Sequence, residues 1–310
     1  MITPPYLKLG DKIAIIATAR KVSKEEMQPA IDILTGWGLN VIEGKNLYKQ
    51  QNQFAGSDEE RLDDLQNVLD NREIKAVLFA RGGYGTMRFA DDIIFSKFIK
   101  NPKWLIGFSD ITSLHKIAKD LKIETLHAPM AFNFAKTPPE ILNQIKDILF
   151  GNNFTLMPAS GITSNPLNRG GTAIGTLTGG NLSLLYAESA ANPKLNFDDN
   201  ILFMEDLDEY LYHLDRMMVS LKRSGKLMNL AGLIVGAMND MRDNTTAFGF
   251  KTDNPFGKTA EEIISEHVAE YDYPVCFNFP AGHIQNNHPL IFGREVELTV
   301  GENIKLKYSH

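Results

Sequence analysis

The sequence contains a single cysteine, Cys276, among 310 residues, so the chain cannot form an internal disulfide. This usage of cysteine is typical of a reducing compartment. Cys276 lies in the apolar run "PVCFNF", where a thiol usually packs as a small hydrophobic side chain. We therefore expect it to be buried and to take no part in catalysis.

Long apolar runs and clusters of basic residues are also absent. No stretch approaches the roughly 20 apolar residues needed to cross a bilayer. The net charge of −6 is spread along the chain, whereas a nucleic-acid surface needs clustered lysine and arginine to neutralise phosphates. The first residues carry Pro4, Pro5 and Asp11 in place of the basic start and unbroken apolar stretch of a secretory signal. We predict a cytoplasmic protein with neither a membrane nor a nucleic-acid partner.

Common cofactor and metal motifs are missing as well. There is no H-E-x-x-H motif, and the H-x-x-x-x-H pair formed by His283 and His288 is a weak ligand set. The segment "RGGYG" (81–85) has neither the lysine pattern of a P-loop nor a G-x-G-x-x-G spacing. It can be a tight turn or a phosphate loop, and the missing pattern disfavours the latter. We predict no cofactor and no metal ion.

Apolar strand-like runs alternate with helical patterns through the first half of the chain. Ser-x-x-Glu capping boxes at 23–26 and 57–60 mark the starts of two helices. Continuous apolar strands separated by helices favour a parallel sheet covered on both faces. The predicted strands are "KIAIIAT" (12–18), "IKAVLFA" (74–80), "KWLIGF" (103–108) and "IETLHAP" (123–129).

The periodic pattern breaks between residues 151 and 171, which are rich in Gly, Asn, Ser and Pro. Such a segment is typical of a connection between domains. We predict an N-terminal α/β domain over 1–150, a linker over 151–171 and a second domain of mixed α and β character over 172–310.

Three predicted strands of the first domain end in segments that could bind a ligand. Ligands of doubly wound sheets bind outside the carboxyl ends of the strands. Two adjacent glycines there allow backbone N–H groups to approach a ligand closely. The three segments are "RGGYG" (81–85), Ser109-Asp110 and "HAPM" (127–130).

Ser109 lies where a buried strand stops and a helix begins. A serine at this point is commonly a helix N-cap. Strand–Gly–x–Ser–helix is also similar to the nucleophile elbow, although Ile111 replaces the second glycine of G-x-S-x-G. The free N–H groups of a helix N-terminus could hold an oxyanion. Local sequence leaves the cap and the nucleophile equally open.

A serine nucleophile needs a histidine base. His127 follows a neighbouring strand, and His283 lies on a loop after an apolar strand, so both could reach the site. His115, about a turn and a half into the helix after the serine, is expected to point elsewhere. His213 falls on an amphipathic helix and His288 shares the loop of His283. A surface or core position is the alternative for each.

The base needs an acceptor that orients its ring. Glu205 fits because the run "NILFMED" ends a buried strand with a carboxylate. A solvated strand end is the alternative. Arg81 is a candidate for binding a substrate carboxylate, because a guanidinium matches that planar anion, or it is a packing arginine. Gly82 beside it is expected to line the same site.

Seven segments carry a resemblance to a known family when they are taken together. They occur in the order "LKLGDKIAIIATA", "LFARGGYGTMRF", "PKWLIGFSDITSLH", "TLHAPM", "LTGGNLSLL", "ILFMEDLDEYLYHLDRMM" and "FPAGH". The series resembles the LD-carboxypeptidase family of serine peptidases, which includes the microcin C immunity peptidases. The resemblance covers essentially the whole chain. It implies an N-terminal doubly wound, flavodoxin-like parallel sheet domain and a smaller C-terminal mixed α/β domain of swivelling β/β/α type.

The resemblance also implies a Ser–His–Glu triad divided between the two domains. The serine of the family's G-[YF]-S-D motif is Ser109, the glutamate of its E-D motif is Glu205, and the histidine of its final G-H motif is His283. The implied oxyanion hole consists of the backbone N–H groups of Gly83 and Asp110.

Other matched positions concern the substrate. Asn181, in "TGGN", falls where the family lines its substrate cleft. Family members commonly have "HGPM" and "GYSD" where this chain has Ala128 and Phe108, which keep the size and character of the pattern. The family also suggests a homodimer.

The implied reaction is hydrolysis of the amide bond between an L-configured centre and a terminal D-amino acid. In murein recycling, this reaction removes D-alanine from a tetrapeptide, so the expected substrate is a small muropeptide. Three alternatives remain at this point: hydrolysis of a peptidyl-nucleotide antibiotic by the same triad, a binding protein for small peptides without catalysis, and a metallopeptidase.

Overall fold

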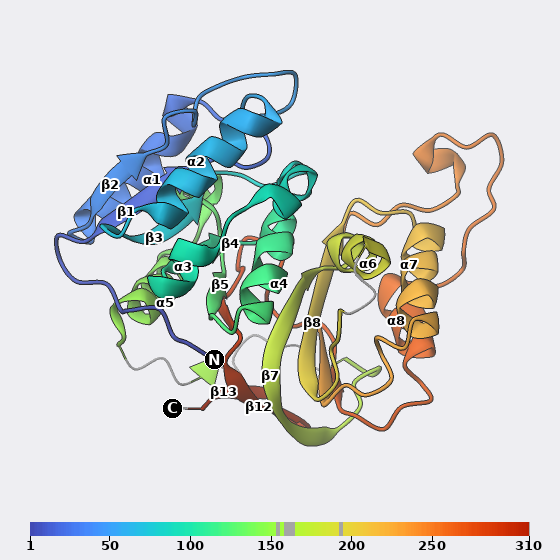
Figure 1. Cartoon of the computed structure of the whole chain (residues 1–310). Helices are drawn as coiled ribbons and strands as arrows, with labels where there is room; N and C mark the ends of the chain where they lie inside the picture. The colour runs from blue at the N-terminus through green and yellow to red at the C-terminus, as the bar shows by residue number, and fades with distance from the viewer. Residues whose placement is uncertain (153–155, 158–164, 192–194, 310) are drawn as a thin grey trace. The chain divides into compact units, whose positions relative to one another are not determined.

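The computed structural model describes residues 1–152, 156–157, 165–191 and 195–309. The chain divides into two compact units, each of which contains one sheet (Figure 1). Unit 1 consists of Met1–Phe154 and Gln285–Arg294, and unit 2 consists of Thr155–Ile284 and Glu295–His310.

The sheet of unit 1 has the strand order β11-β5-β4-β3-β1-β2. Strands β1 to β5 pair in parallel, and β11 pairs antiparallel to β5. The order 2-1-3-4-5 is that of a flavodoxin-like doubly wound sheet, which confirms the predicted fold. The strands are β1 (Lys12–Ile16), β2 (Asn40–Glu43), β3 (Ile74–Phe79), β4 (Trp104–Gly107), β5 (Thr125–His127) and β11 (Leu290–Phe292).

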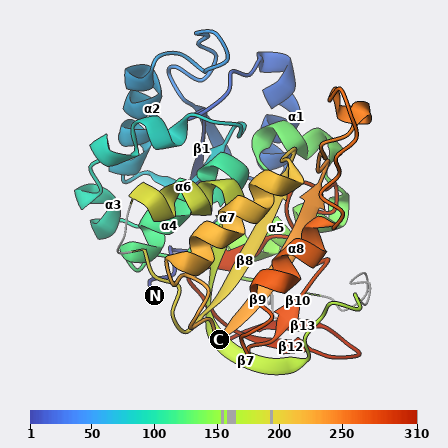
Figure 2. The ribbon, with the colours of Figure 1, turned by 90° about the vertical axis from the view of Figure 1, so that its right-hand side faces the viewer.

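Helices cover both faces of this sheet, which is why its inner strands β1, β3 and β4 are largely apolar. Figure 2 shows α2, α3 and α4 on one side of the strands and α1 and α5 on the other. Leu65, Phe98 and Leu114 pack with Phe79 and Leu105 in the core of the first side. The helices are α1 (Lys24–Gly36), α2 (Asp58–Asp70), α3 (Ser96–Lys100), α4 (Thr112–Asp120) and α5 (Pro139–Phe150).

The two predicted capping boxes form as expected. Ser23 and Ser57 are the N-caps of α1 and α2, and each exchanges hydrogen bonds with the glutamate three residues later. These bonds satisfy backbone N–H groups that the first turn of a helix leaves unpaired.

The sheet of unit 2 has the order β10-β9-β8-β7-β12-β13-β6. Strands β7 to β10 pair in parallel, whereas β7, β12, β13 and β6 pair antiparallel. This confirms the prediction of mixed α and β character. The strands are β6 (Leu156–Met157), β7 (Gly171–Asn181), β8 (Asn200–Leu207), β9 (Gly232–Asn239), β10 (Val275–Cys276), β12 (Glu295–Val300) and β13 (Lys305–Tyr308).

The helices α6 (Leu182–Ala191), α7 (Leu211–Arg223) and α8 (Ala260–His267) lie on one face of that sheet (Figure 1). Their apolar side chains form a core with strand residues of β8 and β9. Leu185, Met217 and Ile264 from the helices are buried together with Leu202 and Val235 from the strands.

The division of the chain differs from the predicted domains in one segment. We expected residues 172–310 to form one domain, but Gln285–Arg294 belongs to unit 1. The reason is that β11 adds to the edge of the first sheet beside β5, and Arg294 forms a two-bond ion pair with the buried Glu124. Much of the predicted linker, 151–171, lies outside the described residues.

Candidate active site

Ser109 lies on a sharp turn between β4 and α4. It is the first residue of the 3₁₀ turn Ser109–Ile111, and its φ of 59° lies in the left-handed region that residues other than glycine seldom adopt. The N-cap position of this turn is Phe108, and no side chain caps it. Within the described part of the chain, the Ser109 hydroxyl has no hydrogen-bond partner. The strained turn resembles a nucleophile elbow, and the missing capping bond excludes the alternative of a helix cap. The nucleophile role itself stays a prediction.

The turn is held by tight packing and by a buried histidine. A Cβ on Gly107 would lie 2.9 Å from Cγ1 of Ile111, so a larger residue here would have to displace the Ile111 side chain. His115 donates from Nε2 to the carbonyl oxygen of Gly107 over 2.9 Å and accepts at Nδ1 from the Thr125 hydroxyl over 2.8 Å. Burial lowers the pKa of His115 to about 4, so its ring is neutral. Both ring nitrogens of His115 are engaged by Gly107 and Thr125.

The glycine-rich segment 81–85 lies against Ser109. A Cβ on Gly82 would be 3.1 Å from Cβ and 3.2 Å from Oγ of Ser109. Gly83 has a φ of +111° and its N–H donates no hydrogen bond to any described residue. The N–H of Asp110, the second residue of a helical turn, has no partner within that turn. The structure therefore brings Gly82 beside the serine.

The side chain of Asp110 connects the glycine-rich segment to the turn at Ser109 through hydrogen bonds. It is fully buried and accepts hydrogen bonds from the Gly85 N–H (3.1 Å), the Thr86 N–H (3.0 Å) and the Thr86 hydroxyl (2.6 Å). Burial raises the pKa of Asp110, but all three partners are donors, which suits the ionised carboxylate. Sequence reasoning assigned only the backbone N–H of Asp110 and missed Thr86.

We expect Thr86→Val to destabilise unit 1. The substitution keeps the branched shape but removes one of three donors to a buried carboxylate, which costs about 1.5–3 kcal/mol. Urea unfolding measures the change, and Thr86→Ser, which keeps the hydroxyl, is the matched control. Equal stability of the valine variant and the wild type would contradict this account of the loop.

In unit 2, His283 and Glu205 form a hydrogen-bonded pair. Glu205 lies in β8 with no exposed surface, and its Oε2 accepts from Nδ1 of His283 over 2.5 Å. Burial, the largest influence, lowers the pKa of His283, but the charge and hydrogen bond of Glu205 raise it, and the net shift is upward. With Nδ1 protonated, the lone pair of the neutral ring is on Nε2.

Two further residues hold this pair in place. Asn239, at the end of β9, donates from Nδ2 to the carbonyl oxygen of His283 over 2.5 Å. Gly282 has a φ of +112°, and a Cβ there would lie 2.8 Å from Oε2 of Glu205. Sequence reasoning missed both residues, although the glycine directly before the histidine was a signal that the backbone approaches another group closely.

Asn181 is buried at the end of β7, directly before α6. Its Nδ2 donates to Oδ1 of Asp206 over 2.8 Å, and its side-chain oxygen accepts from Ser183 and Leu184. Burial and then the charge of Glu205 raise the pKa of Asp206 to about 7. The substrate-binding role of Asn181 stays a prediction.

The remaining candidates lie away from these groups or are engaged elsewhere. The His127 ring is fully buried against the rings of Phe108 and Phe292, so it belongs to the core of unit 1. His288 bonds Gln144 through Nδ1. Cys276 is buried, which raises the pKa of its thiol to about 12.

Arg81 is partly exposed and has partners within unit 1. Its Nη1 lies 3.7 Å from Oε1 of Glu26, and its guanidinium stacks 4.1 Å from the centre of the Phe132 ring. A substrate carboxylate would therefore compete with Glu26. Its binding role stays a prediction.

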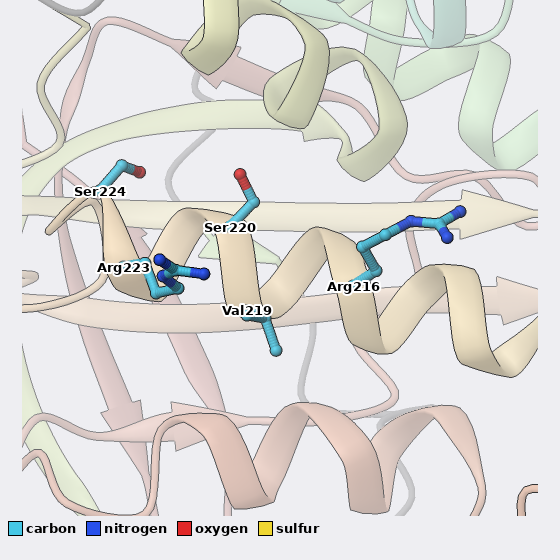
Figure 3. A pocket seen from close by; sticks show the side chains of 5 residues that line it. All are labelled: Arg216, Val219, Ser220, Arg223 and Ser224. Atoms are coloured by element: carbon cyan, nitrogen blue, oxygen red, sulfur yellow. The ribbon is translucent and has the colours of Figure 1, made fainter.

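A surface hollow along α7 contains none of the predicted site residues. Figure 3 shows its lining side chains, which come from α7 and its C-cap residue Ser224 and include Arg216 and Arg223. Among the described residues, no group of three or more His, Cys, Asp or Glu is arranged to hold a metal ion. None of the described helices is long and apolar enough to span a membrane.

The two α/β sheets and the buried glutamate–histidine pair are features typical of α/β enzymes. Residues 13–128 match the model of the LD-carboxypeptidase N-terminal domain, and residues 174–298 match that of the C-terminal domain, both of peptidase family S66. The chain belongs to the LD-carboxypeptidase family and is a peptidase, as the sequence motifs predicted.

Relatives and solved structures agree with this assignment. The chain is 32% identical to a probable murein peptide carboxypeptidase of Bacillus subtilis over 96% of this chain and 92% of the relative. It superimposes with a TM-score of 0.81 and 25% identity on muramoyltetrapeptide carboxypeptidase from Oxalobacter formigenes, which covers 96% of this chain and 99% of that one. An MccF-like protein from Bacillus anthracis, 22% identical, has a TM-score of 0.82 over the full length of both chains and shares the fold.

Proposed function

We propose that this protein is a serine-type LD-carboxypeptidase that releases the terminal D-alanine from murein tetrapeptide. The observation that carries the proposal is the 2.5 Å hydrogen bond from Nδ1 of His283 to the buried Glu205. A neutral histidine fixed in this tautomer is suited to act as a general base. The strained turn at Ser109 and the kinship to murein peptide carboxypeptidases support the same assignment.

In the proposed first step, Oγ of Ser109 attacks the carbonyl carbon of the scissile amide and His283 takes the hydroxyl proton on Nε2. The oxyanion accepts hydrogen bonds from the N–H groups of Gly83 and Asp110, an effect worth a factor of about 10² to 10³ for each donor. Glu205 stabilises the imidazolium that forms.

In the second step, the C–N bond breaks, and the proton on Nε2 passes to the leaving amine of the D-amino acid. The acyl group stays on Ser109 as an ester. His283 then takes a proton from a water molecule, whose oxygen attacks the ester carbonyl. The bond from the carbonyl carbon to Oγ breaks, His283 returns the proton to Oγ of Ser109, and the shortened peptide acid is released.

Mass spectrometry of tetrapeptide and pentapeptide muropeptides after incubation with the protein tests this function. We expect loss of one D-alanine from the tetrapeptide. An aminoacyl-sulfamoyl adenylate, incubated in parallel, tests the antibiotic-hydrolase alternative, to which the proposed mechanism applies equally. Intact muropeptides together with a cleaved adenylate would overturn the murein assignment.

The pH dependence of kcat/KM gives a further prediction. His283 must be neutral to accept a proton, and its pKa is raised above the ordinary value of about 6.5. Activity should therefore rise with pH through that raised pKa and be lost below it. Glu205→Gln removes the charge that raises the pKa, so its profile should shift to lower pH while its maximal rate falls. Profiles recorded between about pH 5 and 9 measure both effects. An unshifted profile of the glutamine variant would contradict the pairing.

A further inference from the structure

The side chain of Arg20 lies across the proposed oxyanion loop. A Cβ on Gly83 would be 2.6 Å from Nε, 2.7 Å from Cδ and 2.8 Å from Cγ of Arg20, so the arginine occupies the space beside this glycine. Arg20 is exposed and follows β1 by four residues. Among the described residues, its guanidinium has no hydrogen-bond, ion-pair or aromatic partner.

The other arginines near this loop each have a carboxylate partner. Arg61 and Arg88 both pair with Asp58, and Arg81 pairs with Glu26. A guanidinium that is already paired gains less from a new anion, because the existing pair must first be broken. Arg20 differs from them because all the N–H donors of its guanidinium are available to bind a ligand.

The chemistry of a carboxypeptidase restricts where a carboxylate-binding cation can lie. In the substrate, the terminal carboxylate carbon is three bonds from the carbonyl carbon of the scissile amide, a separation of roughly 4 Å at most by standard bond lengths. The cation must therefore lie beside the groups that hold the reacting carbonyl. Gly83, whose N–H is the proposed oxyanion donor, is in contact with Arg20, and its neighbour Gly82 adjoins Ser109.

We propose that Arg20, and not Arg81, binds the terminal carboxylate of the peptide substrate. The proposal rests on the proposed function, since it presumes that the peptide carbonyl is held at Gly83. A guanidinium can bind a carboxylate through two parallel hydrogen bonds, which gives both affinity and orientation. Arg20 thereby makes the enzyme specific for the last residue of a chain.

A pair of substrates tests the assignment: a tetrapeptide that ends in D-alanine and the same peptide that ends in D-alaninamide. For Arg20→Gln we expect kcat/KM on the acid to fall by about 10- to 100-fold, chiefly through KM. On the amide, kcat/KM should match that of the wild type, because the lost partner is absent from that substrate. Arg20→Lys should lie between the two, since it keeps the charge without the fork.

Two variants serve as controls. Lys21→Gln removes a neighbouring exposed cation and should leave the preference for the acid over the amide unchanged. Arg81→Gln tests the competing assignment. The proposal is overturned if Arg20→Gln keeps that preference, if it loses activity equally on both peptides, or if the preference disappears only in Arg81→Gln.

Binding measurements separate this proposal from the proposed function. Calorimetry with Ser109→Ala protein gives the Kd of both peptides without hydrolysis, and the double variant Ser109→Ala/Arg20→Gln should bind the acid about 10- to 100-fold more weakly. If the wild type hydrolyses neither peptide, the function fails. In that case the Kd values still test the role of Arg20, because they show whether the double variant has lost the preference for the acid peptide over the amide.

Discussion

Replacing Ser109 with alanine is expected to lower kcat for D-alanine release by a factor of about 10⁴ or more. The hydroxyl is the proposed nucleophile, and alanine offers no atom that can form the acyl ester. Stability should change by no more than about 0.5 kcal/mol, because the hydroxyl has no hydrogen-bond partner among the described residues. Release of D-alanine from tetrapeptide and urea unfolding measure the two quantities.

Ser113→Ala is the matched control for this variant. Ser113 lies one turn further on in α4, is fully buried, and its hydroxyl also has no hydrogen-bond partner in the described structure. We expect its turnover to equal that of the wild type. Near-normal release of D-alanine by folded Ser109→Ala protein would reject the serine mechanism.

Gly282→Ala is expected to reduce kcat by about 10²-fold or more without removing any catalytic group. The new Cβ would lie 2.8 Å from Oε2 and 2.9 Å from Cβ of Glu205. Because Glu205 is fully buried, its side chain can avoid the new Cβ only by moving away from His283. A displacement of about 1 Å in such a site costs a factor of about 10². Turnover of the tetrapeptide measures the loss.

A substitution at a second glycine distinguishes the effect of this contact from the effect of backbone strain. Gly225 also has a positive φ, +74°, but a Cβ there would have no atom within 4 Å. Gly225→Ala should therefore lose some stability from strain and keep its turnover. Equal kcat for Gly282→Ala and the wild type would show that the position of Glu205 does not control the reaction rate.

Much of the fold could be predicted from the sequence because its strands are buried on both faces. The runs that contain β1, β3 and β4 are apolar at nearly every position, and this pattern distinguishes them from helices. Edge strands were missed. β2 is largely exposed, and β11 has only three residues, so neither carries a period long enough to recognise.

Local sequence could not decide between the two roles of Ser109. A strand, a glycine and the start of a helix are found both around a serine that caps a helix and around a nucleophilic serine. The positive φ at Ser109 and the lack of a side-chain capping bond exclude the cap. At the same turn, Ile111 packs closely against Gly107. The isoleucine that departs from the G-x-S-x-G pattern is therefore the residue that fills the turn.

The partners of the other site residues were also beyond local reasoning. Asp110 reaches Thr86, 24 residues earlier in the chain, and Arg20 reaches Gly83. The Glu205–His283 bond spans 78 residues. The family motifs predicted the last of these pairs but not the first two.

By itself, the sequence determined the central strands of the first sheet and the starts of two of its helices, and the resemblance carried by its motifs gave the doubly wound fold and the peptidase family. Apolar periodicity and helix capping depend on residues that are close in the sequence, and a motif is defined by the order of its residue types. These signals can therefore be recognised without a structure. Only the tertiary structure decided the turn at Ser109, the membership of Gln285–Arg294 in unit 1 and the neighbours of each charged group. These features depend on which distant segments pack against one another. That packing determines how much space each side chain has, and the burial it causes shifts the pKa of titratable groups.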